Sequence, residues 1–398
     1  MRPYPSPLWL ASAAAAALAV PAPAAAEEAA PALTLQALYT ADATGVVQGV
    51  RPHAGRYLDN LDLTADLDLE KAVGWSGATL HAYALNNAGG APNDVAGTLQ
   101  GVDNIEVTTP RLRLFELWLE QGFAGGKASV RAGLYNLNSE FYANDAAGLL
   151  IEPAFGIGSE LAATGPNGPS IFPSTGLGAR VNVNFGDGGY ARAAVLNAMS
   201  GVLGDPGGID TSFDDGVLTI GEAGVEGPTR FGLGIWRYSR RQDDIRSVDA
   251  AGAPVTQRGQ GAYALGEQHL FGTDEAANGA AFLRIGVSDG KTTPFKGGWQ
   301  AGVLINRPFA SRPDSAVSFG VQQGVLNQKF RDNLRDAGVR PGRAETGAEI
   351  TYSDKLAPRI TVQPDLQWVR HAGGDRDARD RFIAALRIKI DLSPTPAE

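Results

Sequence analysis

The chain has 398 residues, a formal net charge of −9, 51 glycines and no cysteine. The negative charge disfavours nucleic acid as a partner, because phosphate binding needs a basic face. The lack of cysteine excludes disulfides and a thiol-based active site. The four histidines are scattered without zinc-ligand spacing, so we expect no metal site and no cofactor.

The N-terminus has the features of a secretory signal. Arg2 is the only charge before Glu27, residues 8–20 are apolar, and residues 24–26 are three alanines. The apolar run is too short for a spanning helix, and no later stretch is long and apolar enough for one. We predict a signal peptide at residues 1–26, cleaved near Ala26, then one domain at 27–392 and a disordered tail at 393–398.

Period-2 alternation recurs along the whole chain and predicts β-strands. In LDLTADLDLE at 61–70, the leucines and Ala65 share one face, while Asp62, Thr64, Asp66, Asp68 and Glu70 share the other. We expect an all-β fold, a transmembrane antiparallel β-barrel of about 16 strands with a polar lumen. The predicted strands lie near residues 33–40, 57–71, 76–87, 111–121, 127–136, 178–186, 189–198, 216–225, 229–239, 259–271, 279–289, 297–306, 315–329, 343–353, 357–370 and 380–391.

The strand near 111–121 shows a phase slip. In RLRLFELWLEQ, adjacent Leu114 and Phe115 interrupt the alternation. A β-bulge there would keep the polar side chains on one face. The alternative is a strand that leaves the membrane midway, with its charges in water. The bulge predicts that Arg111, Arg113, Glu116, Trp118 and Glu120 all face the lumen.

The longest interval without alternation runs from Leu137 to Gly176. Loops of such length are usually functional or disordered. This one contains Phe141, Tyr142, Ile151, Phe155 and Phe172, which is too apolar a content for disorder. Because the lumen offers the available shelter in a barrel, we predict that this loop folds inward and narrows the channel.

Several motifs resemble the carbohydrate-selective porin family of Gram-negative outer membranes, also called the B-type outer-membrane porins. The likeness covers nearly the whole chain after the signal, in the family's order. One departure is the C-terminus, because the chain ends on SPTPAE where barrels of outer membranes commonly end on an aromatic residue. The motifs are RLFELWLEQ (113–121), RAGLYNLNSEFYANDAAGLLIEPAFGI (131–157), NGPSIFPSTGLGARV (167–181), GAYALGEQHLF (261–271), ETGAEITYSDKLAP (345–358) and QPDLQWV (363–369).

The resemblance implies a sixteen-stranded barrel with an inward loop, and passive diffusion of glucose-like sugars. It places Glu116, Trp118, Asn138, Glu140 and Phe141 near the constriction. It also implies that the loop returns to the wall through Asn167, Gly168, Pro169 and Arg180, and that later strands carry acidic positions at Glu267, Glu345 and Glu349.

A sugar presents hydroxyls at its edge and an apolar C–H face, so its site needs an aromatic platform with hydrogen-bonding groups around it. We take Trp118 as the platform, with carboxylates accepting from hydroxyls and arginines donating. The alternative for each residue is that it lines the water-filled lumen without recognising a sugar. The candidate constriction residues are Arg111, Arg113, Glu116, Trp118, Arg131, Asn138, Glu140, Phe141 and Arg180.

The acidic rows favour cations over anions. The expected partners are small sugars as transported solutes and the outer-membrane lipid, with a monomer and a homo-oligomer both open. A general diffusion porin without a sugar site is the first alternative, and a soluble all-β protein is another. An outer-membrane barrel enzyme is disfavoured, because no motif such as G-x-S-x-G supports it.

Overall fold

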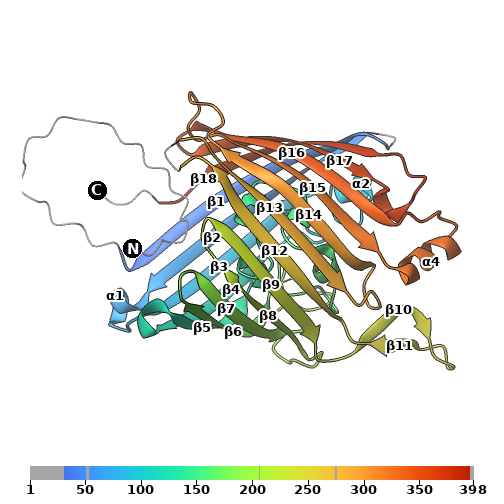
Figure 1. Ribbon diagram of the computed structural model, residues 1–398, viewed down its shortest axis with the longest axis horizontal. Helices are drawn as coiled ribbons and strands as arrows, with labels where there is room; N and C mark the ends of the chain where they lie inside the picture. The colour runs from blue at the N-terminus through green and yellow to red at the C-terminus, as the bar shows by residue number, and fades with distance from the viewer. Residues whose placement is uncertain (1–30, 51–52, 206, 274–275, 395–398) are drawn as a thin grey trace, which may run out of the picture. The chain divides into compact units, whose positions relative to one another are not determined.

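The computed structural model describes residues 31–50, 53–205, 207–273 and 276–394. Within them, sixteen antiparallel strands form a closed barrel (Figure 1). Each strand pairs with its neighbour, and β1 closes the ring by pairing with β18. No helix among these residues is long and apolar enough to cross a membrane. The predicted signal peptide lies outside the described residues.

All sixteen predicted strands are confirmed, with boundary shifts of a few residues at most ends and of eight at the end of the first. The alternating pattern predicted the strands correctly because each strand has one face toward lipid and one toward the interior. The barrel strands are β1 (Leu33–Gln48), β2 (Ala54–Asp68), β3 (Ala78–Gly89), β4 (Leu112–Phe123), β5 (Ala128–Tyr135), β6 (Gly176–Phe185), β7 (Gly189–Asn197), β8 (Val217–Val225), β9 (Thr229–Tyr238), β12 (Gln260–Phe271), β13 (Asn278–Ser288), β14 (Phe295–Asn306), β15 (Ala316–Leu326), β16 (Ala344–Ala357), β17 (Ile360–Arg370) and β18 (Arg381–Asp391).

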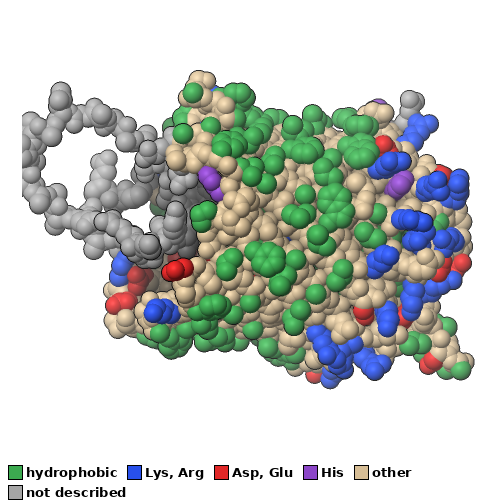
Figure 2. Space-filling model, viewed as in Figure 1, with side chains coloured by type: hydrophobic (Ala, Val, Ile, Leu, Met, Phe, Trp, Pro, Cys, Tyr) green, Lys and Arg blue, Asp and Glu red, His purple; other side chains and the backbone are tan. Residues whose placement is uncertain are grey.

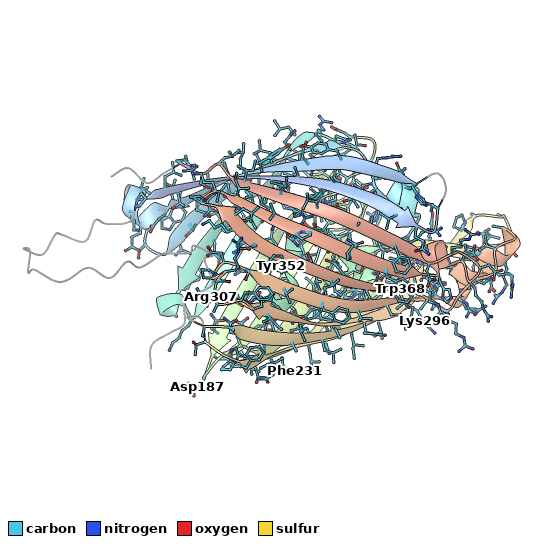
Figure 3. The ribbon with its side chains drawn as sticks, turned by 90° about the horizontal axis from the view of Figure 1, so that it is seen from above. Asp187, Phe231, Lys296, Arg307, Tyr352 and Trp368 are labelled. Carbon is cyan, nitrogen blue, oxygen red and sulfur yellow. The ribbon has the colours of Figure 1, made fainter. Side chains whose placement is uncertain are left out.

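The outer wall carries the apolar face of the strands. Large hydrophobic side chains remain exposed on it, and Figure 2 shows them spread over the strands. In Figure 3, Phe231 points away from the barrel from its place on β9. In water such a surface would be an aggregation liability, but in hydrocarbon it is the expected contact surface.

The two ends of the barrel differ in the length of their connections. One end holds long connections, such as residues 90–111, 136–175 and 239–259, whereas the other holds short ones, such as 186–188 and 358–359. We call these the long-loop end and the short-turn end. Bacterial barrels place short turns in the periplasm and longer loops outside the cell, so in such a membrane we expect the long-loop end to face outward.

The strand near 57–71 ends earlier than predicted. The Asp68 side chain accepts hydrogen bonds from the backbone N–H groups of Glu70 and Lys71, which begins helix α1 (Leu69–Val73). Such N-capping satisfies donors at the first turn. Asp62, Thr64 and Asp66 lie on the interior face, as predicted, but Glu70 belongs to α1, so the acidic row stops at Asp68.

The predicted bulge in β4 is confirmed. Glu116 pairs with Tyr83 and Leu114 pairs with Ala84, so Phe115 is the extra residue. Consequently Phe115 and Glu116 are both buried on the inner side, while Leu114 and Leu117 face outward.

Several short elements escaped prediction. A two-stranded sheet and helix α4 project at the long-loop end, joined by the Arg246–Asp336 ion pair at 2.7 Å. The predicted disordered tail begins with an ordered residue, because Ser393 Oγ accepts from the Ala37 N–H at 3.2 Å. The additional elements are β10 (Gln242–Val248), β11 (Pro254–Gln257), α2 (Asn93–Ala96), α3 (Ser159–Ala162), α4 (Gln328–Asp336), η1 (Ala124–Gly126), η2 (Leu137–Ser139), η3 (Asp145–Ala147), η4 (Pro153–Phe155) and η5 (Ala372–Gly374).

Candidate functional site

The connection at residues 136–175 lies inside the barrel, as predicted, and we call it the long inner loop. Arg284 on β13 donates to the carbonyl oxygens of Tyr142 at 3.0 Å and Gly156 at 2.8 Å. Glu349 on β16 accepts from the N–H groups of Ile151 and Glu152. A buried loop needs hydrogen-bond partners for its backbone N–H and C=O groups. Here acidic and basic side chains of the barrel wall supply these partners.

Tyr142 is held by side chains of three strands and by one residue of the loop itself, Glu160. Its N–H donates to Glu222 at 2.9 Å, its carbonyl accepts from Arg284, and its hydroxyl donates to Glu160 at 2.8 Å. Its ring stacks on Tyr263 with 3.9 Å between centroids. The backbone φ of 55° is unusual for a bulky residue, and these contacts maintain it. The loop position is therefore set by side chains of β8, β12 and β13.

Apolar packing holds the other part of this loop. Leu137, Phe141 and Leu161 are fully buried against inward side chains of β7 to β12, including Leu218 and Trp236. Each fully buried side chain of this size stabilises by about 1.5–3 kcal/mol. The lumen face of these strands is thus apolar where the loop covers it. Phe141 is 0% exposed, so the expectation that it contacts solute at the constriction is wrong, because the loop core encloses it.

A second connection, residues 90–111, also folds inward and was not predicted to do so. Glu345 accepts from the N–H of Leu99 at 2.9 Å, and Gln367 donates to the carbonyl of Val102. Arg387 donates to the side chain of Asn104 at 2.7 Å. Glu345 and Glu349, which the sequence placed on later strands as acidic positions, are therefore loop anchors rather than free lumen lining.

Where the long inner loop meets β4, β5 and β6, four charged residues form the ion-pair cluster: Glu120, Arg131, Glu140 and Arg180. Arg180 lies 3.0 Å from Glu120 and 2.7 Å from Glu140. Arg131 donates to Glu120 at 2.8 Å through Nε and lies 3.5 Å from Glu140. The side chains of Glu120 and Glu140 are 22% and 21% exposed, so both remain partly accessible.

Trp118 lies beside this cluster, between residues of two neighbouring strands. His81 on β3 stacks on the indole with centroids 4.7 Å apart, and the Arg131 guanidinium lies 3.8 Å from the ring. Because β3 and β5 flank β4 on opposite sides, both indole faces are covered. The indole N–H donates to Glu116 at 2.9 Å. A sugar would meet the ring edge and the stacked His81, not an open indole face.

The remaining candidates lie elsewhere. Arg111 is exposed at the long-loop end, 2.6 Å from Asp205. Arg113 is buried and donates to the carbonyl of Pro173 at 3.0 Å, so it anchors the long inner loop. Asn138 bonds the carbonyls of Phe141 and Gly156 within the loop. The structure thus brings together Glu116, Trp118, Arg131, Glu140 and Arg180, but not these three.

Sequence reasoning missed His81, because the four scattered histidines gave no sign that one of them belongs to this site. Its Nδ1 lies 2.7 Å from Asp66, and it is the register partner of Trp118. Both His81 and Trp118 are on lumen-facing positions of their strands, so the register of β3 against β4 would have been enough to predict their contact. Tyr135, whose hydroxyl donates to Glu140, was missed as well.

Charged side chains of both signs line the inner wall, and Arg387 on β18 and Glu222 on β8 are among them. Asp62 and Asp66 lie on β2, whereas Arg192 lies on β7 and Arg230 on β9, which is nearly opposite β2 in the ring of strands. Arg230 Nη1 is 3.9 Å from Asp145 of the long inner loop. Opposed charges across a narrow pore create a transverse field that orients water and polar solutes.

Buried acids occur in both inner loops. Burial raises the pKa of Glu152 to about 8, and the charges of Glu345 and Asp365 add to this. Its Oε1 accepts from Gln322 at 3.0 Å. Burial, together with the charge of Asp42, likewise raises the pKa of Asp103 to about 8. Both inner loops thus carry a buried carboxyl group whose pKa is raised.

Comparison with known proteins agrees with this architecture. The family model described as "Carbohydrate-selective porin, OprB family" matches residues 52–392. Porin B of Pseudomonas aeruginosa is 24% identical over 377 residues, covering 84% of this chain and 82% of that protein.

Solved structures share the fold. The high-pH structure of Pseudomonas putida OprB superposes with a TM-score of 0.81 at 21% identity, covering 91% of this chain and 94% of that one. An anion-selective porin from Comamonas acidovorans gives a TM-score of 0.54 at 12% identity, covering 90% and 99%. Because the family model spans most of the barrel, the chain belongs to the carbohydrate-selective porin, OprB family.

Proposed function

We propose that this sugar-selective outer-membrane porin passes glucose-like sugars by passive diffusion, and that the ion-pair cluster with Trp118 forms its constriction. The observation that carries the proposal is the pairing of Glu140, on the long inner loop, with Arg180 and Arg131 of the wall. This pairing brings donors and acceptors to one place on the channel surface.

Selection at such a site depends on weak, exchangeable hydrogen bonds. Carboxylate oxygens of Glu120 and Glu140 accept from sugar hydroxyls, while the guanidinium of Arg131 donates to them. Because these groups already bond one another, a sugar exchanges one set of hydrogen bonds for another, and its binding stays weak. Such balanced exchange favours passage over retention, as conduction requires.

The export and assembly steps belong to the same proposal. Residues 1–26 act as a signal peptide that is removed near Ala26, and the barrel then inserts in the outer membrane. The N-terminal sequence of protein purified from outer membranes tests this. Glu27 as the first residue supports cleavage at this position, and retention of Met1 excludes it.

The decisive experiment is single-channel conductance in a planar bilayer with glucose titrated in. The wild-type channel should show discrete steps that glucose blocks with a saturating midpoint. Glu140→Gln and Arg131→Gln should raise the midpoint about tenfold, the scale of one hydrogen bond to a charged group. Arg111→Gln, whose side chain lies at the long-loop end, should not move it.

The outcomes separate the possible channels. Steps without any sugar block would indicate a general diffusion porin. A block that the two cluster variants leave unchanged would place the sugar site elsewhere in the lumen.

A further inference from the structure

The outer wall carries a groove along β12. Three consecutive outward positions on this strand, Ala262, Ala264 and Gly266, have small side chains or none. Each lies in register between two large side chains, one on β9 and one on β13. These walls consist of Phe231, Leu233 and Ile235 on β9, and Leu283, Ile285 and Val287 on β13.

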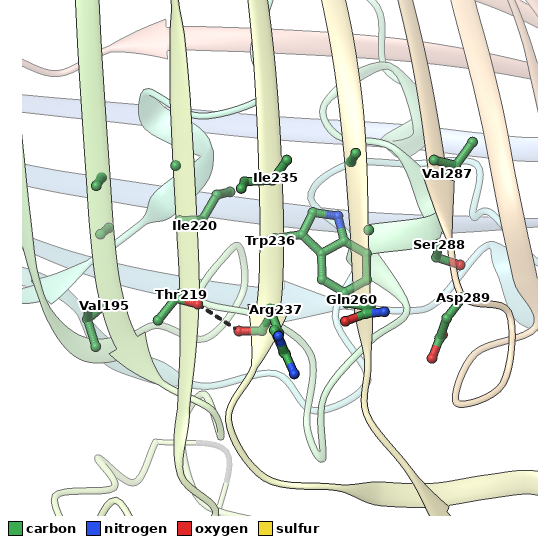
Figure 4. Close-up of a pocket in the computed structure, with 15 residues that line it drawn as sticks. Val195, Thr219, Ile220, Ile235, Trp236, Arg237, Gln260, Val287, Ser288 and Asp289 are labelled. Atoms are coloured by element: carbon green, nitrogen blue, oxygen red, sulfur yellow. Dashed lines mark hydrogen bonds between the residues drawn. The ribbon is translucent and has the colours of Figure 1, made fainter.

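The groove is open and apolar. Its six wall side chains are 48–69% exposed, although they flank a common floor. Toward the long-loop end the groove joins a cavity of about 730 Å³ that extends over β8 to β7 (Figure 4). This volume is within the range of about 300–1,000 Å³ that small-molecule sites occupy. A narrow apolar groove that runs parallel to the strand is complementary in shape to an extended acyl chain.

The end of the groove nearest the long loops is polar. The outward row there contains Thr219, Arg237 and Gln260, which are register neighbours, and Asp289 lies directly after the end of β13. Arg237 is exposed, and no carboxylate of the described residues lies within ion-pair distance of its side chain. Thr219 Oγ1 donates to the Arg237 carbonyl at 3.0 Å (Figure 4), which fixes the backbone there.

The two connections next to β12 at this end, residues 239–259 and 289–294, together with Arg237 on β9, hold six basic and four acidic residues, although the whole chain is acidic. Figure 2 shows lysines and arginines gathered at this end of the face. Lys329 pairs with Asp244 and Arg246 pairs with Asp336, so one acidic and one basic residue of this set are already in ion pairs. The basic residues are Arg237, Arg240, Arg241, Arg246, Arg258 and Lys291, and the acidic ones are Asp243, Asp244, Asp249 and Asp289.

We propose that the groove binds a phosphorylated glycolipid of the outer leaflet, of the lipid A type. One acyl chain lies over Ala262, Ala264 and Gly266, and Arg237 holds a phosphate at the rim. The long-loop end faces outward, so the rim lies at the outer interface and the groove lies in hydrocarbon. Arginine suits this role because its planar guanidinium binds phosphate through two parallel hydrogen bonds.

The test is native mass spectrometry of barrel refolded in detergent without lipid, then mixed with bisphosphorylated lipid A. Arg237→Gln removes the cation, and Ala264→Leu fills the groove floor. Each should lower retained lipid A about tenfold, the scale of one charge-assisted contact. Arg370→Gln, an exposed arginine on β17, and Ala132→Leu, an outward alanine on β5, serve as matched controls.

Heat-modifiable gel migration shows that each variant has folded, and single-channel conductance should be unchanged in all of them. Dephosphorylated lipid A should bind the wild-type protein weakly. Its binding should match that of bisphosphorylated lipid A to the Arg237→Gln variant. Equal binding of the two lipids would overturn the phosphate contact. Equal loss in the control variants would mean a non-specific lipid shell, and so would equal binding of phosphatidylglycerol. A dimer abolished by Ala264→Leu, with lipid binding unchanged, would assign the face to a second barrel instead.

Discussion

Arg284 Nη1 donates to the carbonyl oxygen of Tyr142 at 3.0 Å, although the two residues are 142 positions apart in the chain. The guanidinium is fully buried and has no carboxylate partner within ion-pair distance among the described residues. Its donors serve backbone carbonyls of the long inner loop instead. The strand β13 therefore holds the segment that narrows the channel.

Replacing this arginine should widen the channel. Arg284→Met leaves carbonyls of Tyr142, Phe155 and Gly156 without their donor, at about 1–3 kcal/mol for each unsatisfied buried group. We expect the loop to detach locally, with larger and noisier conductance steps and a weaker glucose block. Planar-bilayer recording measures both. Arg237→Met, on the outer wall, is the control. Conductance steps of Arg284→Met equal to those of the wild type would contradict the anchoring role of Arg284.

A methyl group on Gly286 should have a related effect. A Cβ at this position would lie 1.7 Å from Glu160 Oε1 and 2.2 Å from the Tyr142 hydroxyl. Gly286→Ala should therefore displace the long inner loop while leaving the outer wall intact. Limited proteolysis should cut the loop faster than in wild type.

The matched control for this variant is Gly221→Ala. The nearest atom to a Cβ there is the Arg192 carbonyl oxygen at 3.9 Å, an ordinary contact. Equal cleavage rates in both variants would show that the loop does not depend on the close approach at Gly286.

Stability should fall as pH rises. The folded state raises the pKa of Glu152 to about 8, above its ordinary value, so the folded protein holds a proton that the unfolded chain releases near pH 4.5. Between these values the unfolding free energy should decrease by about 1.4 kcal/mol per pH unit for such a group. Thermal unfolding, followed by the gel shift of the barrel in detergent, should show a lower midpoint at pH 8 than at pH 6.

Glu152→Gln keeps the hydrogen bond from Gln322 and removes the titration. This variant should lose part of the pH dependence, and Asp103→Asn should remove a further part, because the pKa of Asp103 is also raised to about 8. A double variant with the full wild-type pH dependence would exclude both carboxyl groups as its source.

The acidic row of β2 should give the channel a preference for cations. Asp66 keeps 43% of its side-chain exposure on the inner face, so its charge acts directly on ions in the lumen. Asp62→Asn with Asp66→Asn should shift the reversal potential in a KCl gradient toward zero. Asp59→Asn alters an outward carboxylate of the same strand and should leave the potential unchanged. A shift of equal size in both would attribute selectivity to net charge rather than to the lumen row.

The strands could be predicted from the sequence because their period is local, whereas the inner loops depend on distant partners. Leu99 binds Glu345 across 246 positions, and nothing in the polar, turn-rich segment at 90–111 indicates that it is buried. The same reason explains why the position of Trp118 could be predicted but its stacking partner could not. Its position on the lumen face follows from the alternation, but the stacking of His81 follows from the pairing register of β3 and β4.

The ring closes only when the chain's final strand pairs with its first. Until β18 arrives, the edge of β1 that it pairs with, from Leu38 to Gln48, has backbone groups without partners, and such an edge is a template for pairing with other chains. The earlier strands therefore form an open sheet until β18 is present. Contacts between the two ends of a chain form slowly. A chaperone that shields the β1 edge during this interval would decide how much of the protein reaches the membrane rather than aggregating.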